Sequence, residues 1–241
     1  MQRYLAFIAA AMCLLFVVPV SAQDSTLIEY GQTVTGEITN QFFEVPYSFT
    51  GQQGDVIVIE MQRVDIFGDF TSPALILLDE AYNMLGTGQG YDKVVLITVL
   101  PADATYNILA TRQDGRAGTS VGEYSLRLLK LQPLSFDQPV RAALSNKETN
   151  YFMIEGLNSF DLVYKKLSGD FNPEVSLHIL GDNEMLEQVG SLYGPYIASG
   201  TLGINDRSLS NHLYLVIVRE QTYSYSFDEV TADYTLTLVE P

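Results

Sequence analysis

The segment with the clearest catalytic pattern is GTSVG, residues 118–122, which places Ser120 in a G-x-S-x-G arrangement. In hydrolases with this pattern, a strand precedes the serine, a helix follows it, and a histidine and an acid activate it. Here a strand-like segment follows, and the chain has only two histidines, His178 and His212. We therefore expect a hairpin turn and no enzymatic activity. A serine hydrolase acting through Ser120 is the remote alternative.

Acidic residues gather near two segments of similar sequence, residues 72–86 and 172–190, and could form a metal site. Asp65, Asp69, Asp79 and Glu80 cluster around the turn of the first segment, and Asp182, Glu184 and Glu187 surround that of the second. Calcium takes six to eight oxygen ligands, commonly from loop carboxylates, but this spacing matches no EF-hand loop. We expect solvated surface acids and no cofactor. Calcium bound by Asp65, Asp69 and Asp79, in a calcium-stabilised structural adaptor, is the alternative.

Aromatic residues close to the C-terminus could bind a ligand by stacking or by anchoring a partner. Tyr223, Tyr225 and Phe227 alternate, so in a strand they would share one face. Tyr193 and Tyr196 flank a Gly-Pro pair and form a second candidate. These residues are our binding candidates, for an extracellular protein or a polysaccharide. The alternative is an extra edge strand whose aromatic side chains lie in the core.

The first 22 residues have the features of a secretory signal peptide. Arg3 precedes an apolar run that ends in Val20-Ser21-Ala22, a small-residue cleavage pattern. The run is shorter than a membrane-spanning helix requires. We expect a protein that is secreted, periplasmic or on the cell surface, with no membrane insertion after cleavage.

Charge narrows the range of partners. The chain has 13 basic and 29 acidic residues, and removal of Arg3 leaves 12 against 29, a net charge of −17. Such a field disfavours nucleic acid as a partner. The single cysteine, Cys13, lies in the expected signal peptide, so the mature chain can form no disulfide and depends on a hydrophobic core.

The rest of the chain has the pattern of short strands. Leu75 and Leu77 alternate with other residues in SPALILLDEAYNMLG, and residues 55–61, DVIVIEM, are suited to a central strand. The glycines of GTGQG, residues 86–90, predict a turn. No segment has a capped helical period. The fold class is therefore all-β, in antiparallel β-sandwiches.

About a hundred residues later the same pattern returns. NPEVSLHILGDNEML repeats SPALILLDEAYNML, with Pro173 and Leu177 in the places of Pro73 and Leu77. Other segments repeat in the same order, and Tyr214 corresponds to Tyr106. We expect two tandem homologous domains, at residues 25–131 and 134–241. A single large sandwich is the alternative.

These patterns resemble the bacterial pre-peptidase C-terminal domain, a jelly-roll-like β-sandwich. The resemblance lies in Gly54-Asp55, in P-x-L-x-L followed by Asp79, and in Gly122 followed by the alternating residues Tyr124, Leu126 and Leu128. In the second copy, Phe160 and Ala232 replace two of the glycines. Members of that family are non-catalytic appendages of secreted proteins that aid secretion or binding. The resemblance therefore implies a secreted binding or accessory protein.

Overall fold

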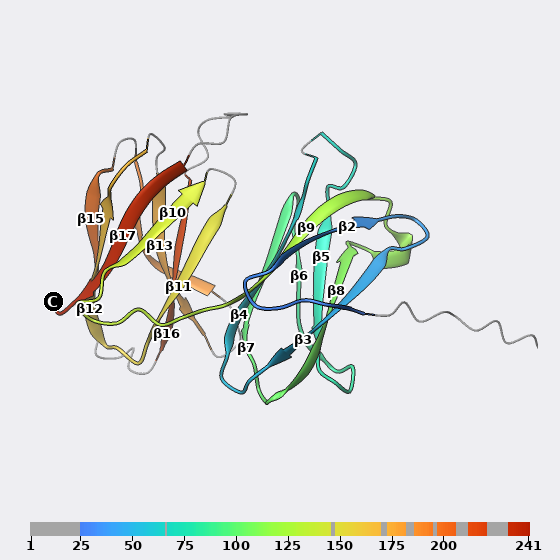
Figure 1. Ribbon diagram of the computed structural model, residues 1–241, viewed down its shortest axis with the longest axis horizontal. Coiled ribbons are helices and arrows are strands. Elements are labelled where there is room, and N and C mark those ends of the chain that lie inside the picture. Colours follow the sequence, from blue (N-terminus) through green and yellow to red (C-terminus); the bar gives the residue numbers. More distant parts are fainter. Residues whose placement is uncertain are drawn as a thin grey trace, which may run out of the picture.

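The computed structural model describes residues 25–65, 67–145, 148–169, 173–181, 186–194, 197–205, 212–220 and 231–241. Regular structure in these ranges consists of strands and one short 3-10 helix, η1 (Gly115–Ala117). In the same ranges, no helix is long and apolar enough to cross a membrane. The strands form two β-sandwiches that lie side by side, the first coloured blue to green and the second yellow to red (Figure 1).

The N-terminal sandwich contains β1 (Thr26–Leu27), β2 (Thr33–Ile38), β3 (Glu44–Gly51), β4 (Val56–Arg63), β5 (Pro73–Leu78), β6 (Met84–Gln89), β7 (Lys93–Val99), β8 (Ala104–Arg112) and β9 (Gly122–Lys130). One sheet has the order β1-β3-β8-β5-β6 and the other β2-β9-β4-β7. The pairs are antiparallel, except that β1 runs parallel to β3.

The C-terminal sandwich contains β10 (Val140–Ser145), β11 (Thr149–Glu155), β12 (Ser159–Lys166), β13 (Pro173–Leu180), β14 (Leu186–Leu192), β15 (Ser199–Asn205), β16 (Leu213–Glu220) and β17 (Thr231–Val239). Its sheets have the orders β10-β17-β12-β15 and β11-β16-β13-β14. All of these pairs are antiparallel.

Both sandwiches have the same strand order. Within β2–β9, the first, last, third and sixth strands form one sheet, and the second, seventh, fourth and fifth form the other; β10–β17 repeat this order. The arrangement is that of a jelly roll, in which two four-stranded sheets face each other. The all-β, jelly-roll-like fold expected from the sequence is confirmed.

The sandwich interiors follow from the alternation of apolar residues. Leu75 and Leu77 are fully buried between the N-terminal sheets, as the period of two predicts. Leu177 occupies the interior of the C-terminal sandwich. The hairpins β5–β6 and β13–β14 each contain an irregularity in register, directly after Leu77 and directly after Leu177.

The glycines of residues 86–90 do not form the expected turn. They lie in β6 and at its end, and their φ angles are not positive. Their role is steric, because a Cβ atom on Gly88 would lie 2.9 Å from Cγ2 of Val94, and one on Gly90 would lie 1.9 Å from the carbonyl oxygen of Lys93. Close packing of β6 against β7 therefore explains these glycines.

Strand β4 is covered on both faces. Ile57, Ile59 and Met61 point into the N-terminal sandwich, whereas Val56 and Val58 point outward and are also buried. The outer cluster consists of residues from both sandwiches, namely Val56, Val58, Leu131, Tyr151, Met153 and Leu215. The sandwiches thus share a small apolar interface, and the unbroken apolar run of β4 reflects burial on two sides.

A polar network extends this interface. The Glu60 carboxylate, on the outer face of β4, accepts a hydrogen bond from the Tyr151 hydroxyl (2.7 Å) and lies 2.6 Å from the Lys93 ammonium. Lys93 also donates to the Thr149 hydroxyl (3.0 Å), and Arg127 donates to the Thr149 carbonyl. Burial and the nearby Glu60 carboxylate raise the pKa of Tyr151, so its hydroxyl remains a donor.

Replacing Glu60 with alanine should destabilise the protein. Glu60 is 6% exposed, and its loss leaves the Tyr151 hydroxyl without this acceptor and the partly buried Lys93 ammonium without its anionic partner. We expect the free energy of unfolding, measured by urea denaturation, to fall by about 2 kcal/mol. Glu37→Ala, at an exposed position of β2, should change it by no more than about 0.5 kcal/mol. Equal effects of the two substitutions would contradict the interface role of Glu60.

Candidate binding site

Loops that follow β2, β4 and β8 meet at one end of the N-terminal sandwich. The sequence places polar and turn-forming residues there, at residues 39–43, 64–72 and 113–121. Such loops satisfy their backbone groups with side chains, because no neighbouring strand is available. Two side chains, Arg112 and Ser120, join these loops to one another.

Arg112 is the last residue of β8 and is only 2% exposed. Its guanidinium donates to the carbonyls of Gly115 (2.8 Å) and Ser120 (3.1 Å) and to Oδ1 of Asn40 (2.9 Å). It also lies 5.9 Å from the centre of the Phe43 ring. Among the described residues no carboxylate forms an ion pair with Arg112. A buried cation is therefore held by loop carbonyls and an amide, and in return it fixes the loop between β8 and β9.

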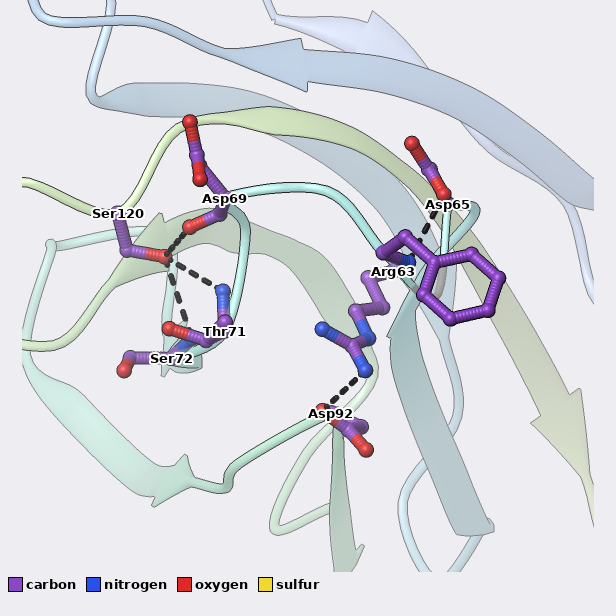
Figure 2. Close-up of polar contacts among 8 residues, drawn as sticks. Arg63, Asp65, Asp69, Thr71, Ser72, Asp92 and Ser120 are labelled. Carbon is purple, nitrogen blue, oxygen red and sulfur yellow. Dashed lines mark hydrogen bonds and ion pairs between the residues drawn. The ribbon is translucent and has the colours of Figure 1, made fainter.

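Ser120 joins that loop to the one between β4 and β5. Its Oγ accepts hydrogen bonds from the backbone N–H groups of Thr71 (2.9 Å) and Ser72 (3.2 Å) and donates to the Asp69 carbonyl (3.2 Å). Figure 2 shows the serine at the centre of these three contacts. The hydroxyl thus satisfies turn backbone that would otherwise lack partners.

The joined loops enclose an open hollow of about 380 Å³. Polar side chains dominate its lining, which consists of Asp69, Thr71, Ser72, Gln113, Asp114, Gly118, Thr119 and Ser120. Its volume falls within the range of small-molecule sites, but it lacks their usual apolar lining. This composition suits a ligand rich in hydrogen-bonding groups.

Most polar side chains of the hollow form no hydrogen bond with the part of the protein that the structure describes. Within the part of the chain that the structure describes, the carboxylates of Asp69 and Asp114 and the hydroxyls of Thr71, Ser72 and Thr119 form no hydrogen bond with the protein. The loop backbone behind them is fixed by Arg112 and Ser120. The hollow therefore combines a fixed frame with free hydrogen-bonding groups, which lowers the ordering cost of binding.

The C-terminal sandwich differs at the corresponding position. Arg112 pairs with Pro73 across β8 and β5, and Glu220 pairs with Pro173 across β16 and β13. Since the two sandwiches have the same strand order, Glu220 occupies the place of Arg112. At this position, therefore, the N-terminal sandwich has a loop-fixing cation and the C-terminal sandwich has an acidic residue.

Exposed aromatic side chains lie on the same end of the N-terminal sandwich. Phe67 is 82% exposed in the loop after β4, Tyr91 is 70% exposed in the loop after β6, and Phe42 is 53% exposed in the loop after β2. Sequence reasoning missed them. The available signal was a phenylalanine in DIFGD, a turn-forming segment in which a large apolar residue has no structural reason to occur.

The catalytic alternative for Ser120 receives no support from this geometry. Strand β9 follows the G-x-S-x-G pattern where a hydrolase requires a helix, and the lining of the hollow contains no histidine. His178 lies on β13, where its Nε2 contacts the Ser176 hydroxyl at 2.9 Å. Burial, and to a lesser degree the nearby Arg219, lower the pKa of His178, so the ring is neutral at pH 7. His212 directly precedes β16.

The three calcium candidates have separate local roles. Asp65 accepts a hydrogen bond from the Phe67 N–H (2.9 Å), and Asp69 lines the hollow. Asp79 lies at the far end of β5, where it accepts hydrogen bonds from the side chain and backbone N–H of Asn83, which lower its pKa. In the described ranges, no three histidine, cysteine or acidic side chains are grouped as metal ligands.

The aromatic candidates from the sequence have a different status. Tyr193 follows β14 and is 65% exposed. Tyr196, Tyr223, Tyr225 and Phe227 lie outside the described residues. Binding through these side chains stays a prediction.

The chain has similar proteins among solved structures, but none among family models or curated sequences. No family model matches the chain, and no curated protein matches it. Among solved structures, the chain is similar to the pre-peptidase C-terminal domain of collagenase from Bacillus anthracis, at 17% identity and a TM-score of 0.36, over 44% of this chain and 95% of that one. The name of that structure is the name of the domain family that the sequence resembles.

A second similar structure spans more of the chain. It is a proposed secreted protein from Parabacteroides distasonis, with 10% identity and a TM-score of 0.25, over 85% of this chain and 88% of that one.

Replacing Arg112 with methionine tests whether it fixes the loops. Methionine keeps an unbranched side chain but removes the donors to Gly115, Asn40 and Ser120. We expect the free energy of unfolding to fall by about 2 kcal/mol. We also expect trypsin to cleave faster after the exposed Arg116, in the same loop.

Arg141→Met is the matched control, because Arg141 forms an exposed ion pair with Asp233. It should cost no more than about 0.5 kcal/mol and leave cleavage at Arg116 unchanged. If both substitutions had the same effect on stability and cleavage, Arg112 would have no special role in the loops.

Proposed function

We propose that the protein is a secreted, non-catalytic binding protein that engages an extracellular protein or polysaccharide through the loop end of its N-terminal sandwich. The observation that carries this proposal is the hollow beside Ser120, where uncommitted hydroxyls and carboxylates are mounted on loops fixed by a buried arginine. Among the described residues, no hydroxyl of the lining forms a hydrogen bond with a carboxylate or histidine that could activate it, so binding accounts for these groups better than catalysis.

The proposed organisation is a signal peptide at residues 1–22 followed by two homologous domains, at residues 25–131 and 134–241. The identical strand order of β2–β9 and β10–β17 supports the duplication. The small-residue pattern that ends at Ala22 supports export, to the periplasm, the cell surface or the medium. The C-terminal domain has a glutamate in place of Arg112, and we assign it the accessory role of a rigid support.

A substitution that fills the hollow tests this function. Thr119 lines the hollow and is exposed, so Thr119→Trp should occupy it without removing a described hydrogen bond. We expect the mature protein to bind a component of its native secretome or cell-wall glycans. The tryptophan should weaken that binding at least tenfold, which corresponds to about 1.4 kcal/mol.

Thr201→Trp provides the control, because Thr201 is exposed on β15 of the other sandwich. Binding that survives Thr119→Trp but is lost in Tyr193→Ala would move the site to the C-terminal sandwich. Binding that neither substitution affects would also overturn the proposed location.

A further inference from the structure

Three exposed apolar side chains form what we term the aromatic loop surface: Val64, Phe67 and Tyr91. They are 51%, 82% and 70% exposed, on the loops that follow β4 and β6. Single exposed apolar residues are common, but large aromatic side chains on neighbouring loops are typical of interaction surfaces.

Arg63, the last residue of β4, joins the loop after β4 to the loop after β6. Its backbone N–H donates to the carbonyl of Asp92 (3.0 Å), and its guanidinium lies 3.1 Å from the Asp92 carboxylate. Figure 2 shows the ion pair. The same guanidinium lies 5.9 Å from the centre of the Tyr91 ring. Tyr91 is therefore supported by Arg63 and still exposes most of its surface.

In the loop after β4, the described residues Val64, Phe67 and Gly68 are held by hydrogen bonds as well. The Asp65 carboxylate accepts a hydrogen bond from the Phe67 N–H, and the Asp65 carbonyl accepts one from Gly68 (3.1 Å). At the base of the loop, the Val64 N–H donates to the carbonyl of Glu123 (3.1 Å). The aromatic loop surface is thus presented on ordered turns, which reduces the entropy cost of docking.

Charge around this surface is strongly negative. Asp65, Asp69, Asp92 and Glu123 are acidic residues on or beside its loops, against the guanidinium of Arg63 and the ammonium of Lys93, which forms an ion pair with Glu60. The carboxylate of Asp92 is half exposed even with its ion pair. Aromatic faces and carboxylates both attract cations, and Val64 can contact the methylene stem of a long basic side chain.

We propose that the aromatic loop surface binds a lysine- and arginine-rich segment of an extracellular protein. This inference rests on the proposed function and names the chemistry of the partner. Lysine or arginine side chains would lie on the faces of Phe67 and Tyr91, with their charges opposite Asp65 and Asp69. The net charge, −17 for the mature chain, adds attraction at longer range.

The test measures binding of the mature protein to a short fluorescent peptide of alternating lysine and serine, by fluorescence anisotropy at low salt. A glutamate–serine peptide and a glucosamine oligomer are the comparison ligands. We expect only the basic peptide to bind, and its affinity to fall about tenfold in a Phe67→Ala/Tyr91→Ala variant. Tyr193→Ala, which removes an aromatic side chain of similar exposure from the other sandwich, should bind as the parent does.

An Asp65→Asn/Asp69→Asn variant separates charge from fold, because asparagine can still accept the Phe67 N–H. It should weaken binding and reduce its salt dependence. No binding of the basic peptide, binding that the Phe67→Ala/Tyr91→Ala variant leaves unchanged, or binding of the glucosamine oligomer alone would each overturn the inference. None of these results decides the effect of Thr119→Trp on the natural partner, so the proposed function is tested separately.

Discussion

The packing of one strand on two sides is the constraint on which the arrangement of the molecule depends. The inner residues of β4, Ile57 and Ile59, close the N-terminal sandwich, and its outer residues, Val58 and Glu60, contact the C-terminal sandwich. Because strand side chains alternate, the register that fills the core also fixes which residues reach the partner sandwich. A slip of one residue would place Glu60 in the N-terminal core. Fold and inter-sandwich geometry are therefore set by the same residues.

The two sandwiches share an architecture and differ in what their loops hold. A jelly roll needs only apolar alternation and turns, and both copies supply these. A long, solvent-exposed loop needs further polar contacts to adopt one conformation. The N-terminal sandwich provides them through the buried Arg112 and the three hydrogen bonds of Ser120. Burial of a cation is costly unless its donors are satisfied, and the hydrogen bonds of Arg112 satisfy them at this loop end, whereas Glu220 occupies the corresponding place in the C-terminal sandwich.

Sequence reasoning predicted what depends on local pattern. The alternation around Leu75 and Leu77 predicted buried strands, and the β-branched run of residues 56–59 predicted a central one; both are confirmed. It failed where the reason lies in distant residues. The glycines at 88 and 90 were assigned to a turn because only the structure places β7 against them. Ser120 attracted attention for its motif, but its partners are backbone groups some fifty residues earlier in the chain. The periodicity of apolar residues in the sequence does not predict contacts between residues so far apart in the chain.

The shared interface on β4 should hold the two sandwiches in one relative position, and a distance measurement between them tests this most directly. The only cysteine of the chain, Cys13, lies in the expected signal peptide, so spin labels can be placed at Glu37→Cys and Thr201→Cys without a competing thiol. Both positions are exposed, one on β2 and the other on β15. Double electron–electron resonance should give one narrow distance distribution in the mature protein. A broad distribution, or several distances, would contradict a shared interface built on β4.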